Sequence, residues 1–71
     1  MAMNYAYNYA YIDAATNMCI QVISTSNPEQ GTLEGWVEIP VNDENYLMKY
    51  YINGNWYEDA EGTIPWTSSL L

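Results

Sequence analysis

The sequence predicts a mainly β fold: a small antiparallel sheet of about five strands built from hairpins, with one short helical turn near residues 43–48 and extended termini. Two observations carry this prediction. Residues 50–57 place Asn-Gly between two aromatic runs, and Asn-Gly favours the type I′ turn of a hairpin because both turn positions need a positive φ. Upstream, tyrosines recur at every second position, the period at which side chains share one face of a strand: Tyr5, Tyr7, Tyr9 and Tyr11.

The first two strands are expected to form a hairpin. The alternating run predicts a strand over residues 3–11, which ends at Ile12-Asp13. Residues 14–17 are expected to connect it to a second strand over residues 18–25, which is rich in apolar and β-branched residues. The polar stretch 26–32 contains proline and glycine, so we expect an exposed loop there.

A short third strand is expected over residues 36–40. Alternation places Val37 and Ile39 on one face, with Trp36 and Glu38 on the other, and Pro40 stops the ladder. Asn42 or Asp43 is then a suitable N-cap for the helical turn, because its side-chain oxygen can accept a backbone N–H bond.

The last two strands follow from counting outward from the Asn-Gly turn. Cross-strand pairs of aromatic residues stabilise such a hairpin, and the outermost pair sets the only basic residue opposite an acid. The structural residues of the hairpin are Tyr50, Tyr51, Asn53, Gly54, Trp56 and Tyr57. The predicted pairs are Ile52 with Asn55, Tyr51 with Trp56, Tyr50 with Tyr57, and Lys49 with Glu58.

We expect one domain, with an N-terminal arm or strand extension at 1–8, a small β domain at 9–61 and an extended C-terminal arm at 62–71. A chain of 71 residues buries a modest fraction of its surface and usually needs a staple or a partner. Cys19 is the only cysteine, so an internal disulfide is excluded, and there is no histidine to join it in a zinc site. Apolar residues flank Cys19, which predicts a buried structural thiol rather than a reactive one.

The charge balance limits the partners. Nine acidic residues stand against one lysine, for a net charge of −8, whereas nucleic-acid binding needs clustered Lys and Arg. We therefore expect no nucleic-acid partner and no anionic membrane surface. No segment has the apolar length of a membrane span, and the start of the chain lacks the pattern of a secretory signal. Synthesis in a cytoplasm is expected.

The sequence indicates no catalytic chemistry. Histidine, the commonest general base and metal ligand, is absent. The serines have no basic partner nearby in the sequence, and the acidic pairs at 43–44 and 58–61 supply only fragments of a glycosidase or calcium site. We expect no enzyme activity, no metal and no cofactor.

The order of the segments nevertheless resembles a known family. Tyr-Ala-Tyr-Ile-Asp at 9–13 leads into Met-Cys-Ile-Gln-Val at 18–22. Val-Glu-Ile-Pro at 37–40, Asp-Glu-Asn-Tyr-Leu-Met-Lys-Tyr at 43–50 and Tyr-Ile-Asn-Gly-Asn-Trp-Tyr-Glu at 51–58 follow. This order is similar to a small module found in tail and baseplate-region proteins of tailed bacteriophages and prophages of Gram-positive bacteria. Met48 departs from that pattern, which usually has glycine at this place. The resemblance implies a non-enzymatic virion component that packs against other chains, and no binding residues carry over.

The expected function is therefore that of a phage structural protein of the tail, baseplate or fibre, or a capsid decoration protein. It would be made in the host cytoplasm and located in the virion, as a homo-oligomer or as a subunit beside other virion proteins. An acidic DNA-mimic inhibitor of a host nucleic-acid enzyme and a small carbohydrate-binding module are the alternatives. Eight tyrosines and three tryptophans suit interfaces. Interface contacts are expected from Tyr5, Tyr7, Tyr9 and Tyr11, then Trp66 and Leu70, although the tyrosine face can equally cover the domain's own core.

Overall fold

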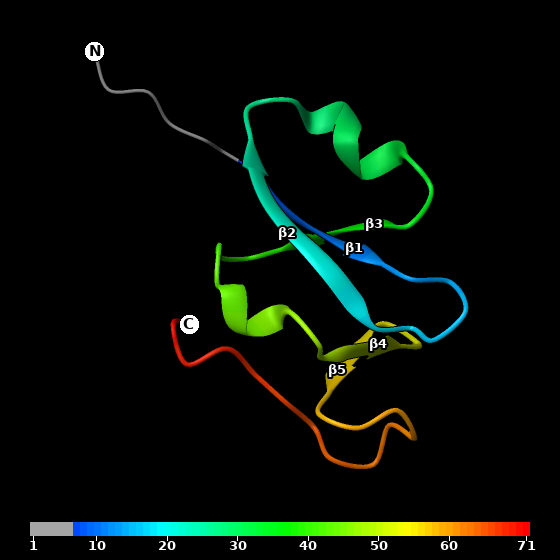
Figure 1. Ribbon diagram of the computed structural model, residues 1–71. Coiled ribbons are helices and arrows are strands. Elements are labelled where there is room, and N and C mark those ends of the chain that lie inside the picture. Colours follow the sequence, from blue (N-terminus) through cyan, green and yellow to red (C-terminus); the bar gives the residue numbers. More distant parts are fainter. Residues whose placement is uncertain (1–6) are drawn as a thin grey trace.

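The structure is a computed structural model that describes residues 7–71. This part of the chain contains five strands and two short 3₁₀ turns (Figure 1). The mainly β prediction is therefore confirmed. The elements are β1 (Tyr7–Ile12), β2 (Cys19–Thr25), η1 (Pro28–Thr32), β3 (Trp36–Ile39), η2 (Glu44–Tyr46), β4 (Tyr50–Ile52) and β5 (Asn55–Tyr57).

The five strands form two antiparallel sheets. The larger sheet has the order β2-β1-β3, and the smaller one pairs β4 with β5. An isolated bridge between Met18 and Tyr50 joins them. Beside this bridge, the backbone N–H of Cys19 donates to the carbonyl of Lys49 at 2.8 Å, and the N–H of Met48 donates to the carbonyl of Cys19 at 2.9 Å. The sheets are thus held together by main-chain bonds as well as by side-chain packing.

The turn between β1 and β2 depends on local polar side chains. Asn17 has a φ of 65°, a conformation that asparagine tolerates better than most residues. Its N–H donates to the carbonyl of Asp13 at 2.7 Å, and the Thr16 hydroxyl donates to the Asp13 carboxylate at 2.8 Å. A bulge between Tyr11 and Ile12 shifts the register where the strands enter this turn.

The register of the larger sheet separates an alanine face from a tyrosine face. Ala10 of β1 pairs with Val22 of β2 and with Val37 of β3, and directly paired side chains share a face. Asn8 pairs likewise with Ile39. The hydrophobic core forms on this alanine face, around the buried residues Ala10, Cys19, Ile39 and Tyr46. The predicted separation of Val37 and Ile39 from Trp36 and Glu38 follows from this register.

The tyrosine face is covered by η1, where the sequence predicted only an exposed loop. Tyr9 is 3% exposed, and its hydroxyl donates to the carbonyl of Pro28 at 3.2 Å. Asn27 caps η1 by accepting a bond from the N–H of Glu29 at 3.0 Å. A Cβ at Gly31 would lie 2.8 Å from the Tyr9 ring, so the absence of a side chain there allows the 3₁₀ turn to approach the sheet closely.

The β4–β5 hairpin is confirmed in its turn and in its three inner pairs. Asn53 and Gly54 have φ values of 51° and 84°, as a type I′ turn requires. The observed pairs are Ile52 with Asn55, Tyr51 with Trp56, and Tyr50 with Tyr57.

The expected outer pair of Lys49 and Glu58 does not continue this ladder. The N–H of Glu58 donates to the carbonyl of Ile64 at 2.8 Å. The ammonium of Lys49 lies 5.0 Å from the centroid of the Trp66 ring. The chain beyond the hairpin folds back, so the backbone of Glu58 pairs with Ile64 instead of Lys49.

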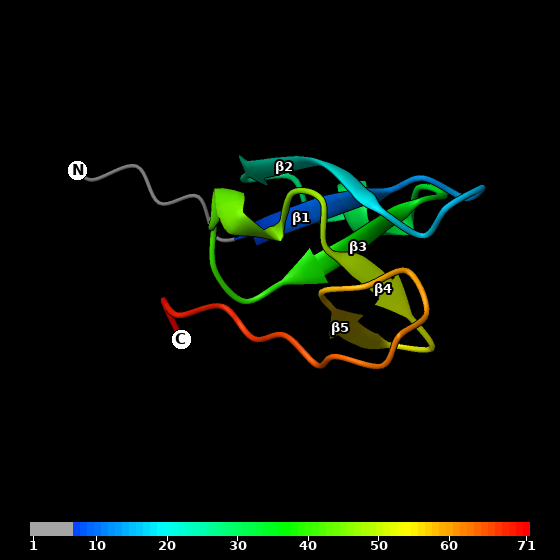
Figure 2. The ribbon, with the colours of Figure 1, turned by 60° about the horizontal axis from the view of Figure 1, so that its bottom comes forward.

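The C-terminal segment packs along the hairpin. Pro65 forms a bridge with Tyr57, and the N–H of Trp66 donates to the carbonyl of Trp56 at 3.0 Å. Figure 2 shows this segment, orange to red, running back from the hairpin along the underside of the molecule. Residues 62–71, expected as an extended arm, lie extended against their own domain as far as the buried Ser68.

Candidate binding groove

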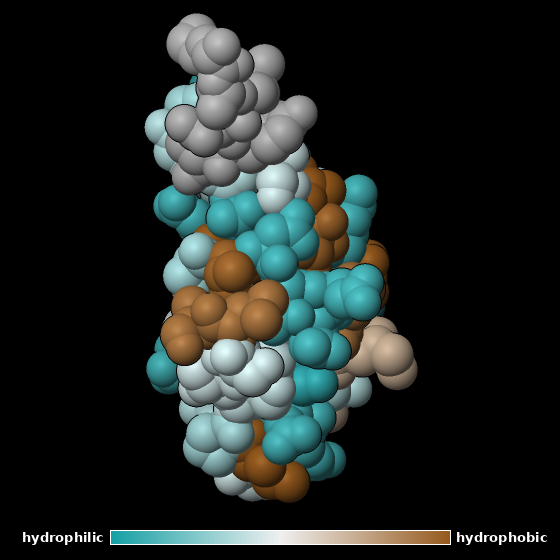
Figure 3. Space-filling model, turned by 90° about the vertical axis from the view of Figure 1, so that its left-hand side faces the viewer, coloured by the Kyte–Doolittle hydropathy of each residue, from teal (hydrophilic) through white to brown (hydrophobic). Residues whose placement is uncertain are grey.

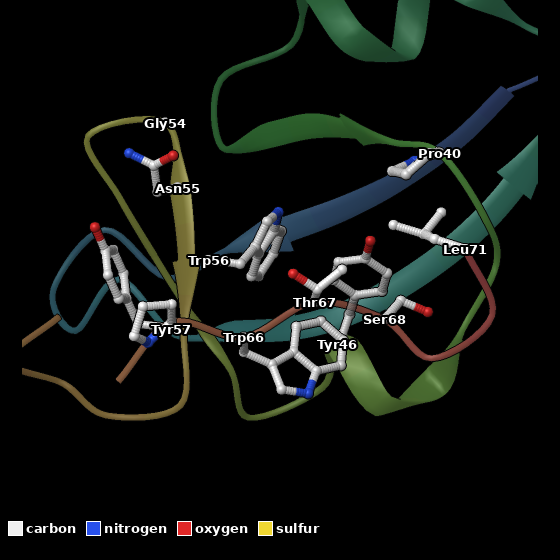
Figure 4. A pocket seen from close by; sticks show the side chains of 11 residues that line it. Pro40, Tyr46, Gly54, Asn55, Trp56, Tyr57, Trp66, Thr67, Ser68 and Leu71 are labelled. Carbon is white, nitrogen blue, oxygen red and sulfur yellow. The ribbon is translucent and has the colours of Figure 1, made fainter. Parts of the chain in front are cut away.

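An open groove of about 540 Å³ lies between the hairpin and the C-terminal segment (Figure 4). Its lining includes Trp56 of the hairpin and Trp66 of the C-terminal segment, whose backbones are joined by a hydrogen bond. The lining residues are Pro40, Tyr46, Gly54, Asn55, Trp56, Tyr57, Pro65, Trp66, Thr67, Ser68 and Leu71.

Three aromatic rings form the base of this groove. Tyr46 is 2% exposed, and its ring centroid lies 4.8 Å from those of both Trp56 and Trp66, with interplanar angles of 69° and 81°. Edge-to-face contacts of this kind stabilise aromatic pairs beyond their buried area. Figure 4 shows Trp56 extending from β5 toward Tyr46, whereas Tyr57 and Asn55 lie on the other side of the strand.

Two polar side chains hold the C-terminal segment beside Tyr46. The Ser68 hydroxyl donates to Oδ2 of Asp43 at 2.5 Å, and both residues are buried. Asp43, one of the two caps that the sequence allowed, is the N-cap of η2, and its Oδ1 accepts the N–H of Asn45 at 2.9 Å. The bond from Ser68, followed by that from Asn45, holds the pKa of Asp43 below its ordinary value.

The acidic residues divide into two groups by type. Each of the three aspartates accepts hydrogen bonds within a turn: Asp13 from Thr16, Asp43 from Asn45, and Asp59 from Thr63 and Ile64. The six glutamates are exposed: Glu29, Glu34, Glu38, Glu44, Glu58 and Glu61. The negative charge of the surface therefore comes mainly from the glutamates, whereas the aspartates stabilise turns of the backbone.

Several large apolar side chains lie on the surface of the described residues. They are Ile20, Leu33, Leu47, Met48, Ile64, Leu70 and Leu71. Figure 3 shows separate brown patches with teal polar regions between them on one face of the molecule. Leu71 belongs to the groove, and the residue before it in the chain, Leu70, is 60% exposed.

The residues predicted for the interface lie in different places. Tyr5 falls outside the described residues. Tyr9 is buried beneath η1, Tyr7 stacks on it at 6.4 Å, and Tyr11 packs 5.0 Å from Trp36. Within residues 7–71 the tyrosine face therefore covers part of the domain's own interior.

Among the predicted interface residues that fall within residues 7–71, only Trp66 lies in the groove. Trp66 lines it together with hairpin residues Trp56 and Tyr57, whereas Leu70 is not among the lining residues. Tyr46 and Pro40 were not selected from the sequence. The one available signal for Tyr46 was its position three residues after the predicted cap Asp43.

The described part of β1 is not free to add to the edge of a partner's sheet. It is the central strand, with β2 on one side and β3 on the other, so both of its edges are paired. Residues 7–11, which belong to the strand predicted over residues 3–11, are therefore unavailable to extend a partner's sheet. The outer edges of this sheet belong to β2 and β3.

Among residues 7–71, no group of three or more His, Cys, Asp or Glu side chains converges as a metal site would require. No helix in this part of the chain is long and apolar enough to cross a membrane. Cys19 is 0% exposed, as predicted, and burial raises the pKa of its thiol.

Comparison with known protein families found no matching family, and searches of the curated proteins and of the solved structures found no match either. The resemblance to phage tail modules thus stays a prediction from the sequence.

Proposed function

We propose that this chain is a non-enzymatic protein-binding module that acts by assembling with other chains, as a tail, baseplate, fibre or decoration component of a phage virion would. The phage assignment rests on the order of motifs between residues 9 and 59. The binding role rests on the physical character of the groove.

The observation that carries the proposal is the aromatic groove between the hairpin and the C-terminal segment. Trp56, Tyr57 and Trp66 are partly exposed there, and Trp and Tyr are the residues that most often dominate the binding energy of interfaces. Leu71, which also lines the groove, and its neighbour in the chain, Leu70, are exposed. Burial of such side chains by a partner would supply hydrophobic free energy of about 25 cal/mol per Å².

The proposal is tested by measuring the solution mass of the chain with light scattering coupled to size exclusion, over a range of concentrations. We expect a stable oligomer that dissociates in the variant Leu70→Glu. Ser69→Glu is the matched control, because Ser69 is exposed and gains the same charge one position away. A monomer at every concentration would count against self-assembly, and equal masses for the two variants would count against this surface.

A second candidate function, carbohydrate binding, is supported by the two tryptophans at the groove. Aromatic rings can stack on the apolar face of a pyranose, but Tyr46 packs edge-on against both indoles and Lys49 lies over the Trp66 ring. These contacts leave less ring area for a sugar. Tryptophan fluorescence that stays unchanged across a glycan panel would remove this candidate.

A further inference from the structure

The shape of the groove limits its occupant. Tyr46 forms its base, Trp56 stands beside it, and Pro40 and Leu71 lie toward one end (Figure 4). Tyr46 is only 2% exposed, so contact with an occupant falls to the partly exposed Trp56 and Trp66 and to the apolar Pro40 and Leu71. Apolar side chains from separate segments along an open groove suit an extended segment with compact apolar side chains.

Proline is the residue that best matches this surface. Its ring is compact and apolar, and its fixed φ favours the polyproline II conformation before binding. Aromatic-lined grooves bind proline-rich segments for this reason, since little conformational entropy is lost on docking. Apolar and aromatic rings from four different parts of the chain, at positions 40, 46, 56 and 66, line the groove.

Charge selects among proline-containing segments. The chain carries a net charge of −8, and its only basic side chain already lies over Trp66. Two exposed glutamates adjoin groove residues in the sequence: Glu44 precedes Tyr46 by two positions, and Glu58 follows Tyr57. A basic segment would be attracted to this surface and an acidic one repelled.

We infer that the groove binds an extended, proline-containing segment of a partner protein that carries arginine or lysine beside its prolines. This inference rests on the proposed function, because it names the kind of partner that the binding module takes.

The test is a titration of the full chain with a short synthetic peptide in which proline pairs alternate with arginines, followed by tryptophan fluorescence and calorimetry. Two comparison peptides carry glutamate in place of arginine, or glycine in place of proline. The groove variant is Thr67→Arg, since Thr67 is exposed and lines the groove. Ala14→Arg is the matched control, because Ala14 is exposed in the β1–β2 turn and receives the same charge.

We expect the arginine-proline peptide to bind the chain and the Ala14→Arg control alike, with affinity about tenfold or more lower for Thr67→Arg. Binding should weaken as salt is added. Equal binding to both variants, or equal binding of the glutamate peptide, would overturn the inference. If no peptide binds while light scattering shows an oligomer that Leu70→Glu dissociates, the inference is wrong and the proposed function stands. If both experiments fail, both proposals fall.

Discussion

The hydroxyl of Ser68 donates a hydrogen bond to Oδ2 of Asp43 at 2.5 Å across a sequence separation of 25 residues. Ser68 is 3% exposed and Asp43 is 4% exposed. The same serine oxygen accepts the N–H of Leu70 at 3.1 Å. A single hydroxyl therefore connects the cap of η2 to the C-terminal segment, and it fixes the segment that carries Trp66 beside Tyr46.

Replacing Ser68 with alanine should lower the free energy of unfolding by about 1–3 kcal/mol, because a buried carboxylate oxygen loses its donor. The measurement is urea unfolding followed by tryptophan fluorescence. Ser69→Ala is the control, since Ser69 is exposed, and it should change the free energy of unfolding by less than about 0.5 kcal/mol. Equal effects of the two substitutions would show that the bond to Asp43 contributes no stability.

Acid should remove part of the stability that Asp43 contributes. Its pKa lies below the ordinary aspartate value of 3.8 in the folded chain, chiefly because Ser68 donates to it and then because the N–H of Asn45 does. A carboxyl with a lowered folded pKa stabilises fully above its unfolded pKa, and this contribution falls as the pH drops through the folded value. The unfolding free energy should therefore fall in the acid range below about pH 5.

The variant Asp43→Asn separates this effect from the general change in net charge. It should be less stable than the parent near neutral pH, and the difference should shrink as the pH falls below 3.8. Urea unfolding at several pH values gives the two curves. A difference that stays constant with pH would contradict the assignment. The pKa of Asp59 is lowered mainly by the Thr63 hydroxyl and then by the Ile64 N–H. The stability of this variant should therefore still depend on pH through Asp59.

The elements that could be predicted from the sequence are those whose determinants are local. Asn53-Gly54 set the turn, and counting from it gave three correct pairs. Alternation in β3 separated Val37 and Ile39 from their neighbours, and the cap at Asp43 located η2. In each case the residues that determine the geometry are within a few positions of one another.

The remaining features depend on contacts that the linear pattern does not contain. The tyrosine alternation predicted one shared face, but only folding shows that η1 covers Tyr9 through Pro28 and Gly31. The groove combines residues from positions 40 to 71, and its base depends on the bond from Ser68 to Asp43. Trp66 could be predicted from its residue type. Tyr46 could not, because nothing in the sequence around it distinguishes a buried tyrosine from a partly exposed one.

Gly35 offers a test of how closely the tyrosine face is packed. It has a φ of 90°, and a Cβ there would lie 2.6 Å from Cε1 of Tyr11, whose ring is already held against Trp36. Gly54 has a similar φ of 84° but nothing within 4 Å of the same position. Gly54→Ala should therefore show the backbone penalty alone, roughly 1–2 kcal/mol. Gly35→Ala should cost about 1–3 kcal/mol more because of overpacking.

Thermal or urea unfolding of the two variants measures this difference directly. Equal losses of stability would mean that the Tyr11 ring moves aside at no cost, and the close approach at Gly35 would then have no energetic role.

Cys19 should react slowly with a thiol reagent in the folded chain. Its side chain is 0% exposed, its Sγ–H donates to the carbonyl of Gln21 at 3.4 Å, and burial raises the pKa of the thiol. Because the thiolate is the reactive form, labelling requires an opening of the structure around β2. The reaction with a disulfide reagent is followed by absorbance, and complete labelling in denaturant confirms that the thiol is intact. Rapid labelling without denaturant would contradict this burial.

The labelling rate also distinguishes two consequences of the Ser68→Ala substitution. In one case, only global unfolding exposes Cys19, and reclosing is faster than labelling. The labelling rate then follows the unfolding equilibrium, and a loss of about 1.4 kcal/mol in the free energy of unfolding should raise this rate about tenfold. If Ser68→Ala frees only the C-terminal segment, Cys19 should label at the parent rate while the fluorescence of Trp66 changes. We expect the first result, because Asp43 caps η2 and η2 places Tyr46 in the same buried cluster as Cys19.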